Sequence, residues 1–217
     1  MRRTALASAM FALLSYGAAH WLTHDFQVWT SEGARRLEIA LDPLAAPFID
    51  VEGPGVPRPT PLAQLLSNEG AVTVIDFIYT RCVTICAALG SAFQQMQSAI
   101  AQSESVPGAA PLRLLSISFD PEHDDTGVLA AYSAGLHADP GIWRFVRVAH
   151  PAGNANARRL LDHYQVTVIP DGVGGFEHNT ALLVADPTGR LVHVFDYAEL
   201  DTALGFARSL AAKGSAQ

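Results

Sequence analysis

The chain has 217 residues, enough for one domain of ordinary size with some chain left over at its ends. Hydrophobic residues make up 49% and charged residues 16%, a composition that can build a buried core and excludes a disordered protein. The net charge is −7 and Lys213 is the only lysine, which argues against nucleic-acid binding because that function needs a basic surface.

Residues 1–22 are typical of a signal peptide or a membrane anchor. Arg2 and Arg3 precede an uncharged run that ends at residue 19. The run of ~15 to 18 residues is long for a signal peptide and short for a membrane span, so cleavage and retention both remain open. A buried first helix of a cytosolic domain is the less favoured alternative. We expect the rest of the chain on the periplasmic side of a bacterial inner membrane, either anchored or secreted into the periplasm.

Residues 23–47 show no sustained apolar period, so we expect a linker there and a folded domain over 48–217. A stretch rich in turn residues, 52–61, opens that domain. From residue 71 onward, strand and helix patterns alternate. Strands are expected at 71–79, 112–119, 142–148, 179–185 and 191–195. Helices are expected at 84–104, from a cap at 124–126 to about 137, at 154–164 and at 198–212. A parallel βαβ unit followed by a final hairpin predicts an α/β, thioredoxin-like fold, a central mixed sheet flanked by helices.

Cys82 and Cys86 are the only cysteines, which excludes a disulfide framework and a four-cysteine zinc site. They follow the first of these strands and open the next helix, where the helix dipole favours the thiolate form. The i, i+4 spacing places both on one helix face. In an exported protein, such a pair forms a disulfide, cycles as a redox pair or binds a soft metal. Thioredoxin-type redox pairs have two intervening residues, whereas this pair has three.

Two thiolates leave a metal ion undercoordinated, so a histidine near the cysteines is the natural third ligand. His123 follows the second strand and is the weaker candidate. His178 precedes the strand at 179–185, a position that lies beside the cysteine loop in a thioredoxin-like sheet. Cys82, Cys86 and His178 would form a soft donor set suited to Cu(I) and able to accept Cu(II).

Three segments in this order resemble the Sco/SenC copper chaperones, and the resemblance extends over about residues 47–212. Residues 76–86 are similar to the family's F-x-Y-T-x-C-x-x-x-C segment, and residues 116–124 to its S-x-D-P-E-x-D segment. His178, followed by L-L-V-A-D-P-T-G-R at residues 182–190, is similar to the family segment in which a histidine precedes a D-P-x-G-R turn. The resemblance implies a copper metallochaperone without catalytic residues. It would bind one copper ion through Cys82, Cys86 and His178, with Asp120 in support, and deliver it to the copper centre of a respiratory oxidase subunit. A Cys82–Cys86 disulfide would block binding, which implies a thiol reductant protein as a partner.

The departures from the family pattern favour an alternative function. Val83 and Ala87 stand where the family usually has proline, so the cysteine loop is less constrained and suits a flexible dithiol. The alternative is a thiol–disulfide oxidoreductase that reduces partner cysteines before metallation, with Cys82 as the nucleophile and no need of His178. A peroxidase that uses Thr80 and Arg81 is a third, weaker reading, because the cysteine spacing suits it poorly.

Overall fold

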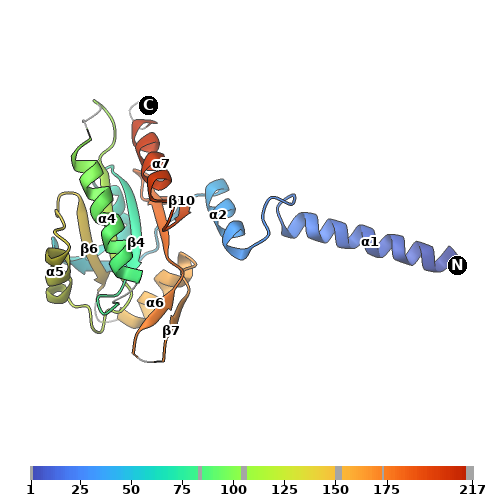
Figure 1. The fold of residues 1–217 in the computed structure, drawn as a ribbon, viewed down its shortest axis with the longest axis horizontal. Coiled ribbons are helices and arrows are strands. Elements are labelled where there is room, and N and C mark those ends of the chain that lie inside the picture. The colour runs from blue at the N-terminus through green and yellow to red at the C-terminus, as the bar shows by residue number, and fades with distance from the viewer. Residues whose placement is uncertain (1, 83–84, 104–106, 150–152, 173, 214–217) are drawn as a thin grey trace. The chain divides into compact units, whose positions relative to one another are not determined.

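The computed structural model describes residues 2–82, 85–103, 107–149, 153–172 and 174–213 (Figure 1). The chain divides into two compact units, Met1–Asp42 and Pro43–Gln217. The first unit begins with helix α1 (Arg2–Leu22), none of whose residues is buried. By length and composition α1 is apolar enough to cross a membrane, a property that export signals share.

A second helix, α2 (Ser31–Leu41), follows in the first unit, inside the range expected to be a linker. Its start is fixed by Thr30, whose hydroxyl accepts a hydrogen bond from the backbone N–H of Gly33 at 3.0 Å. Glu32 then pairs with the arginines one turn further along, Arg35 and Arg36. The cap and the ion pairs, at spacings of i, i+3 and i, i+4, stabilise this short helix.

An eight-stranded mixed sheet forms the second unit, in the order β1-β10-β9-β4-β5-β6-β2-β3. The three strands β4, β5 and β6 are parallel, and the other neighbours pair antiparallel. All seven residues of β4 are buried, as a β-branched strand at the centre of a sheet should be. A separate ribbon contains β7 and β8. The strands are β1 (Leu44–Ala45), β2 (Asp50–Gly53), β3 (Val56–Pro61), β4 (Val72–Ile78), β5 (Leu112–Ser118), β6 (Trp143–Val148), β7 (Val168–Pro170), β8 (Phe176–His178), β9 (Ala181–Ala185) and β10 (Arg190–Asp196).

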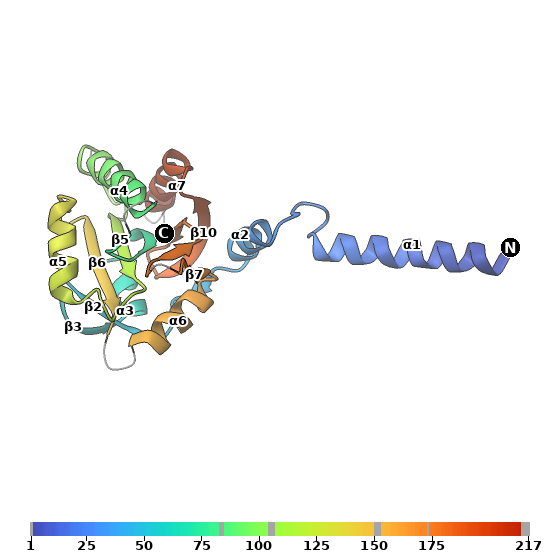
Figure 2. The same cartoon turned by 60° about the horizontal axis from the view of Figure 1, so that its bottom comes forward.

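Helices cover both faces of this sheet (Figure 2). Their bounds are α3 (Leu62–Ser67), α4 (Ile85–Ala101), α5 (Thr126–Gly135), α6 (Gly153–His163) and α7 (Leu200–Lys213). The helices α4, α5 and α7 supply Phe93, Leu129 and Ala207 to a buried cluster with Trp143 of β6. On the other face, Tyr164 at the end of α6 packs against Phe77 of β4, with ring centroids 6.0 Å apart.

The strands and helices expected from residue 71 onward are all present, with their ends shifted by a few residues. The hairpin β2–β3 was not expected, because its stretch is rich in proline. β3 contains Pro57, Pro59 and Pro61 but lies at the edge of the sheet, where a missing backbone N–H costs little. Strand β1 pairs with β10 and lies inside the expected linker range 23–47.

Candidate functional site

Cys82 lies in the turn that follows β4, at the carboxyl end of the central parallel strands. Its backbone N–H donates to the carbonyl oxygen of Tyr79 at 3.2 Å, and Cys82 is 8% exposed. Cys86 is the second residue of α4, so the strand–cysteine–helix order agrees with the expectation. The side chain of Cys86 lies outside the described part of the structure, and its pairing with Cys82 stays a prediction.

Asp124 fixes the turn from the neighbouring strand. Its carboxylate is fully buried and accepts hydrogen bonds from the backbone N–H of Thr80 at 3.0 Å and from the Thr80 hydroxyl at 2.5 Å. It also accepts from the hydroxyl of Ser118, the last residue of β5, at 2.6 Å. The ends of β4 and β5 are therefore joined through one carboxylate. From the sequence, Asp124 was one of three candidate residues for the cap of α5, but Asp125 fills that position.

Asp120, expected to support the site, reaches the cysteine turn through Arg81. Its carboxylate pairs with Arg81 Nη2 at 2.7 Å and with His123 Nδ1 at 2.9 Å. Because Arg81 immediately precedes Cys82, the carboxylate can influence the turn without a direct contact to sulfur. His123, the weaker candidate for the third ligand, is half exposed and engaged with Asp120 through this nitrogen.

His178 is the last residue of β8, and both of its ring nitrogens are buried without a hydrogen-bond partner among the described residues. Burial lowers the pKa of the imidazole because it disfavours the charged form. The adjacent backbone of Asn179 opposes that shift, although it makes no hydrogen bond of standard geometry to either nitrogen. A buried imidazole kept neutral and without a partner suits a metal ligand, which must be deprotonated to bind.

Aromatic rings connect His178 to the strand that leads into the cysteine turn. The ring of Phe119 lies 5.3 Å from the imidazole of His178 and 5.3 Å from the ring of Tyr79. Phe176 joins the same cluster, 5.3 Å from Tyr79. No local sequence pattern predicts this cluster, because its members come from three separate segments.

Two other histidines are held by contacts of their own. His163 Nε2 lies 2.8 Å from the carbonyl oxygen of Ala45. His193 packs between Phe195 and Phe206 at ring-centroid distances of 4.4 and 4.9 Å. Helix α7 supplies Phe206.

Within the described part of the chain, no group of three His, Cys, Asp or Glu side chains is close enough together to hold a metal ion. The expected set includes Cys86, whose side chain is not among those described. What fits copper in this structure is the chemistry of the donors and the buried, unpartnered imidazole of His178.

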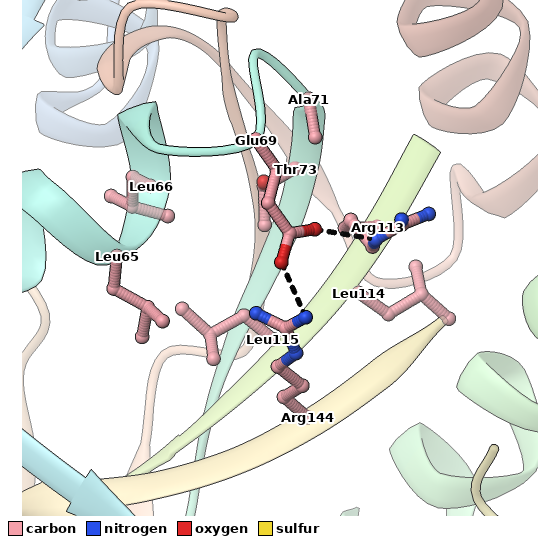
Figure 3. A pocket seen from close by; sticks show the side chains of 9 residues that line it. All are labelled: Leu65, Leu66, Glu69, Ala71, Thr73, Arg113, Leu114, Leu115 and Arg144. Carbon is pink, nitrogen blue, oxygen red and sulfur yellow. Dashed lines mark hydrogen bonds and ion pairs between the residues drawn. The ribbon is translucent and has the colours of Figure 1, made fainter. Parts of the chain in front are cut away.

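A pocket lies at the opposite, amino-terminal end of the parallel strands (Figure 3). Two guanidinium groups converge there on one carboxylate: Glu69 pairs with Arg113 at 3.0 Å and with Arg144 at 2.5 Å. Burial alone would raise the pKa of Glu69, but the hydrogen bonds and charges of the two arginines outweigh it and lower the pKa. This pocket has no cysteine or histidine in its lining and is separate from the cysteine turn.

Comparison with known proteins gives a consistent family match. The SCO1/SenC family model matches residues 65–210. The SCO1 protein homolog of Bacillus subtilis (strain 168) is 24% identical over 136 residues, which covers 63% of this chain and 67% of that protein.

Solved structures share the fold at low sequence identity. BsSco, a member of the Sco family of cytochrome c oxidase assembly proteins, superposes with a TM-score of 0.64 at 18% identity, over 79% of this chain and 95% of BsSco. Arabidopsis thaliana ScoI with copper bound gives a TM-score of 0.61 at 16% identity, over 76% of this chain and 99% of ScoI. A SCO1/SenC family lipoprotein from Bacillus anthracis str. Ames gives a TM-score of 0.64 at 19% identity, over 78% of this chain and 98% of that one. The expected thioredoxin-like fold, in the form that Sco proteins have, is confirmed.

Proposed function

The chain belongs to the SCO1/SenC family, and on that basis we propose that it is an exported copper metallochaperone. It binds one copper ion through Cys82, Cys86 and His178 and delivers it to the copper centre of a respiratory oxidase. Support comes from a family relative solved with copper bound and from one described as a cytochrome c oxidase assembly protein. No turnover of its own is required, so the protein acts as a binding and delivery module.

The observation that carries this proposal is the state of His178. A buried imidazole normally has a hydrogen-bond partner, because an unpartnered polar group in the interior costs stability. Both ring nitrogens of His178 are buried without one among the described residues, at the end of β8 and beside Phe119. A ligand on one of these nitrogens would remove that cost.

The chain's own residues explain how copper is taken up and released. Two thiolates and one imidazole favour Cu(I) and still accept Cu(II). Transfer proceeds by exchange of ligands between the two proteins, without a covalent intermediate. The cysteines must be reduced first, because a Cys82–Cys86 disulfide has no thiolate to offer, and a thiol reductant protein is therefore a further partner.

Helix α1 supports a location outside the cytoplasm for this chemistry. Helix α1 follows two arginines, which stay on the cytoplasmic side under the positive-inside rule. The copper-binding unit is then in the periplasm, either secreted after cleavage or held at the membrane surface by α1. Either arrangement brings it to the side of the membrane where a dithiol is exposed to oxidation.

A thiol–disulfide oxidoreductase is the second candidate. The position of Cys82 in the turn after β4 and of Cys86 in the first turn of α4 favours it, because this is where thioredoxin-like enzymes carry their redox pair. BsSco, a member of the Sco family, is described as having a disulfide switch, which also supports this candidate. This function needs the two cysteines alone, so dependence on His178 separates the candidates.

The test is a copper titration of the reduced full-length protein in detergent, beside His178→Ala and His163→Ala. The proposal predicts one equivalent of tightly bound copper, a thiolate charge-transfer band with Cu(II), and weaker binding in His178→Ala alone. His163 is the matched control, a histidine held by a backbone carbonyl away from the cysteine turn. Unchanged binding in His178→Ala would overturn the ligand set and favour the oxidoreductase.

A further inference from the structure

The strand that carries His178 does not belong to the main sheet. β8 pairs with β7 in a separate two-stranded ribbon, with Val168 opposite His178 and Pro170 opposite Phe176. The ladder of the main sheet therefore does not set the position of the imidazole relative to Cys82. Only Asn179 and Thr180 link β8 to β9 of the main sheet, and contacts from outside the ribbon act together with this link to set the register.

Tyr79 supplies such a contact with its hydroxyl group. The hydroxyl donates to the carbonyl oxygen of Phe176 at 2.9 Å and accepts from the backbone N–H of Phe176 at 3.0 Å. One side chain thus binds both backbone polar groups of a single residue on β8, as a neighbouring strand would. Phe176 and His178 are two residues apart on this strand and share a face of the ribbon.

The backbone of the same tyrosine holds the other half of the site. The carbonyl oxygen of Tyr79 accepts the N–H of Cys82 at 3.2 Å. Tyr79 is 5% exposed, and its ring packs against Phe119 and Phe176, so its position is well fixed. One residue therefore contacts the cysteine turn through its backbone and the histidine strand through its side chain.

Gly175 makes room for this contact. A Cβ atom at this position would lie 3.1 Å from the Tyr79 hydroxyl oxygen and 2.5 Å from Asp171 Oδ2. Asp171 also closes the end of the ribbon, since its Oδ1 accepts the N–H of Gly175 at 2.8 Å. The tip of the ribbon is thus shaped so that the tyrosine hydroxyl reaches the backbone of the next residue.

We propose that Tyr79 is a positioning residue for copper binding, and that its hydroxyl fixes the register of His178 against the Cys82 turn. The proposal rests on the proposed function, because it assigns to Tyr79 a role in the same copper site. A tyrosine in this role acts through His178 and does not itself touch the metal. Mutation of a residue that holds a metal ligand in place, without contacting the metal itself, typically lowers metal affinity by about 10- to 100-fold.

The test is a double-mutant cycle on the reduced full-length protein in detergent, with Cu(I) affinity measured by competition against a chromophoric chelator. Tyr79→Phe keeps the ring and removes only the hydroxyl. It is expected to weaken Cu(I) binding by about tenfold in the wild-type background and to have no effect in a His178→Ala background. Tyr164→Phe is the matched control, a buried tyrosine that packs against Phe77.

A second measurement needs no copper. The Phe176 amide proton, which the Tyr79 hydroxyl accepts, should exchange with solvent faster in Tyr79→Phe, while amides of β4 keep their protection. Unchanged exchange at Phe176, no loss of affinity, or an equal loss in both backgrounds would each overturn the positioning role and leave the copper function standing. If the single variant His178→Ala binds copper as tightly as the wild type, the proposed function is overturned, and the positioning role of Tyr79 with it.

Discussion

The carboxylate of Asp124 accepts both the backbone N–H and the hydroxyl of Thr80, at 3.0 and 2.5 Å. Thr80 lies two residues before Cys82, so a side chain from beyond β5 determines where the cysteine turn begins. The Ser118 hydroxyl, at 2.6 Å, completes a set of three donors around one buried carboxylate. One carboxylate oxygen accepts from the Thr80 N–H and the Ser118 hydroxyl, and the other accepts from the Thr80 hydroxyl, so both oxygens are used as acceptors.

Asp124→Asn should therefore destabilise the protein without changing the shape of the side chain. Asparagine keeps one acceptor oxygen and replaces the other with an NH2 group, so the Thr80 hydroxyl can no longer donate to a carboxylate, and loss of such a charge-assisted hydrogen bond costs about 1.5–3 kcal/mol. Chemical denaturation should show a lower free energy of unfolding by about this amount. Asp125→Asn is the control, because Asp125 caps α5 and asparagine caps helices equally well. Equal effects of the two substitutions would contradict the role of Asp124.

Asp76 should make stability depend on pH. This carboxyl is fully buried in β4, and burial raises its pKa from 3.8 to about 7, although hydrogen bonds from Ser116 and from its own backbone oppose the shift. The folded state then holds a proton that the unfolded state releases above pH ~4, so stability falls as pH rises from about 4 to about 7. At about 1.4 kcal/mol per pKa unit, the fall is on the order of 4 kcal/mol.

Asp76→Asn should remove this dependence, because the amide stays neutral throughout. Unfolding free energies measured between pH 4 and pH 8 should give a flatter curve for Asp76→Asn than for the wild type. Asp201, an exposed aspartate in the first turn of α7, provides the control substitution Asp201→Asn. If wild type and Asp76→Asn lose stability in parallel, the buried carboxyl is not the source of the pH dependence.

Much of the fold could be predicted from local sequence patterns, and the strands that were not predicted were missed for physical reasons. Strand β4 and the helix after it could be predicted because their patterns of apolar residues are regular. β3 has three prolines that argue against a strand, and only its place at the sheet edge makes them tolerable. The ribbon β7–β8 is two three-residue strands, too short to give a periodic signal.

The candidate site could likewise be predicted from the sequence only in part. Cys82, Cys86 and His178 were identified from residue type, spacing and family resemblance. The links among Tyr79, Phe176 and Phe119 depend on tertiary contacts between distant segments, which no local pattern records. Asp124 was visible in the sequence but interpreted as a helix cap, because its neighbour has the same side chain.

Asp120 should affect copper binding through Arg81. The two side chains form an ion pair at 2.7 Å, and Arg81 is adjacent to Cys82 in the chain. Asp120→Asn and Arg81→Gln should each weaken Cu(I) binding several-fold, and the double variant should be no weaker than the worse single one. Additive losses in the chelator competition assay would show that the two residues act independently.

The pocket at the far end of the sheet should matter to stability alone. Glu69→Gln removes the carboxylate shared by Arg113 and Arg144. Because these groups are partly exposed, the free energy of unfolding should fall by only about 1 kcal/mol or less. The loss should shrink at high salt, where exposed charges are screened. Copper affinity measured on the same variant should equal that of the wild type. A changed affinity would mean that the pocket is coupled to the cysteine turn.

X-ray absorption spectroscopy of the Cu(I)-loaded full-length protein would identify the atoms that bind copper. We expect two sulfur scatterers and one nitrogen scatterer around the ion. The imidazole signature of that nitrogen should be lost in His178→Ala and retained in His163→Ala. A spectrum with sulfur alone, or one that His178→Ala leaves unchanged, would contradict the assignment of Cys82, Cys86 and His178 as the copper ligands.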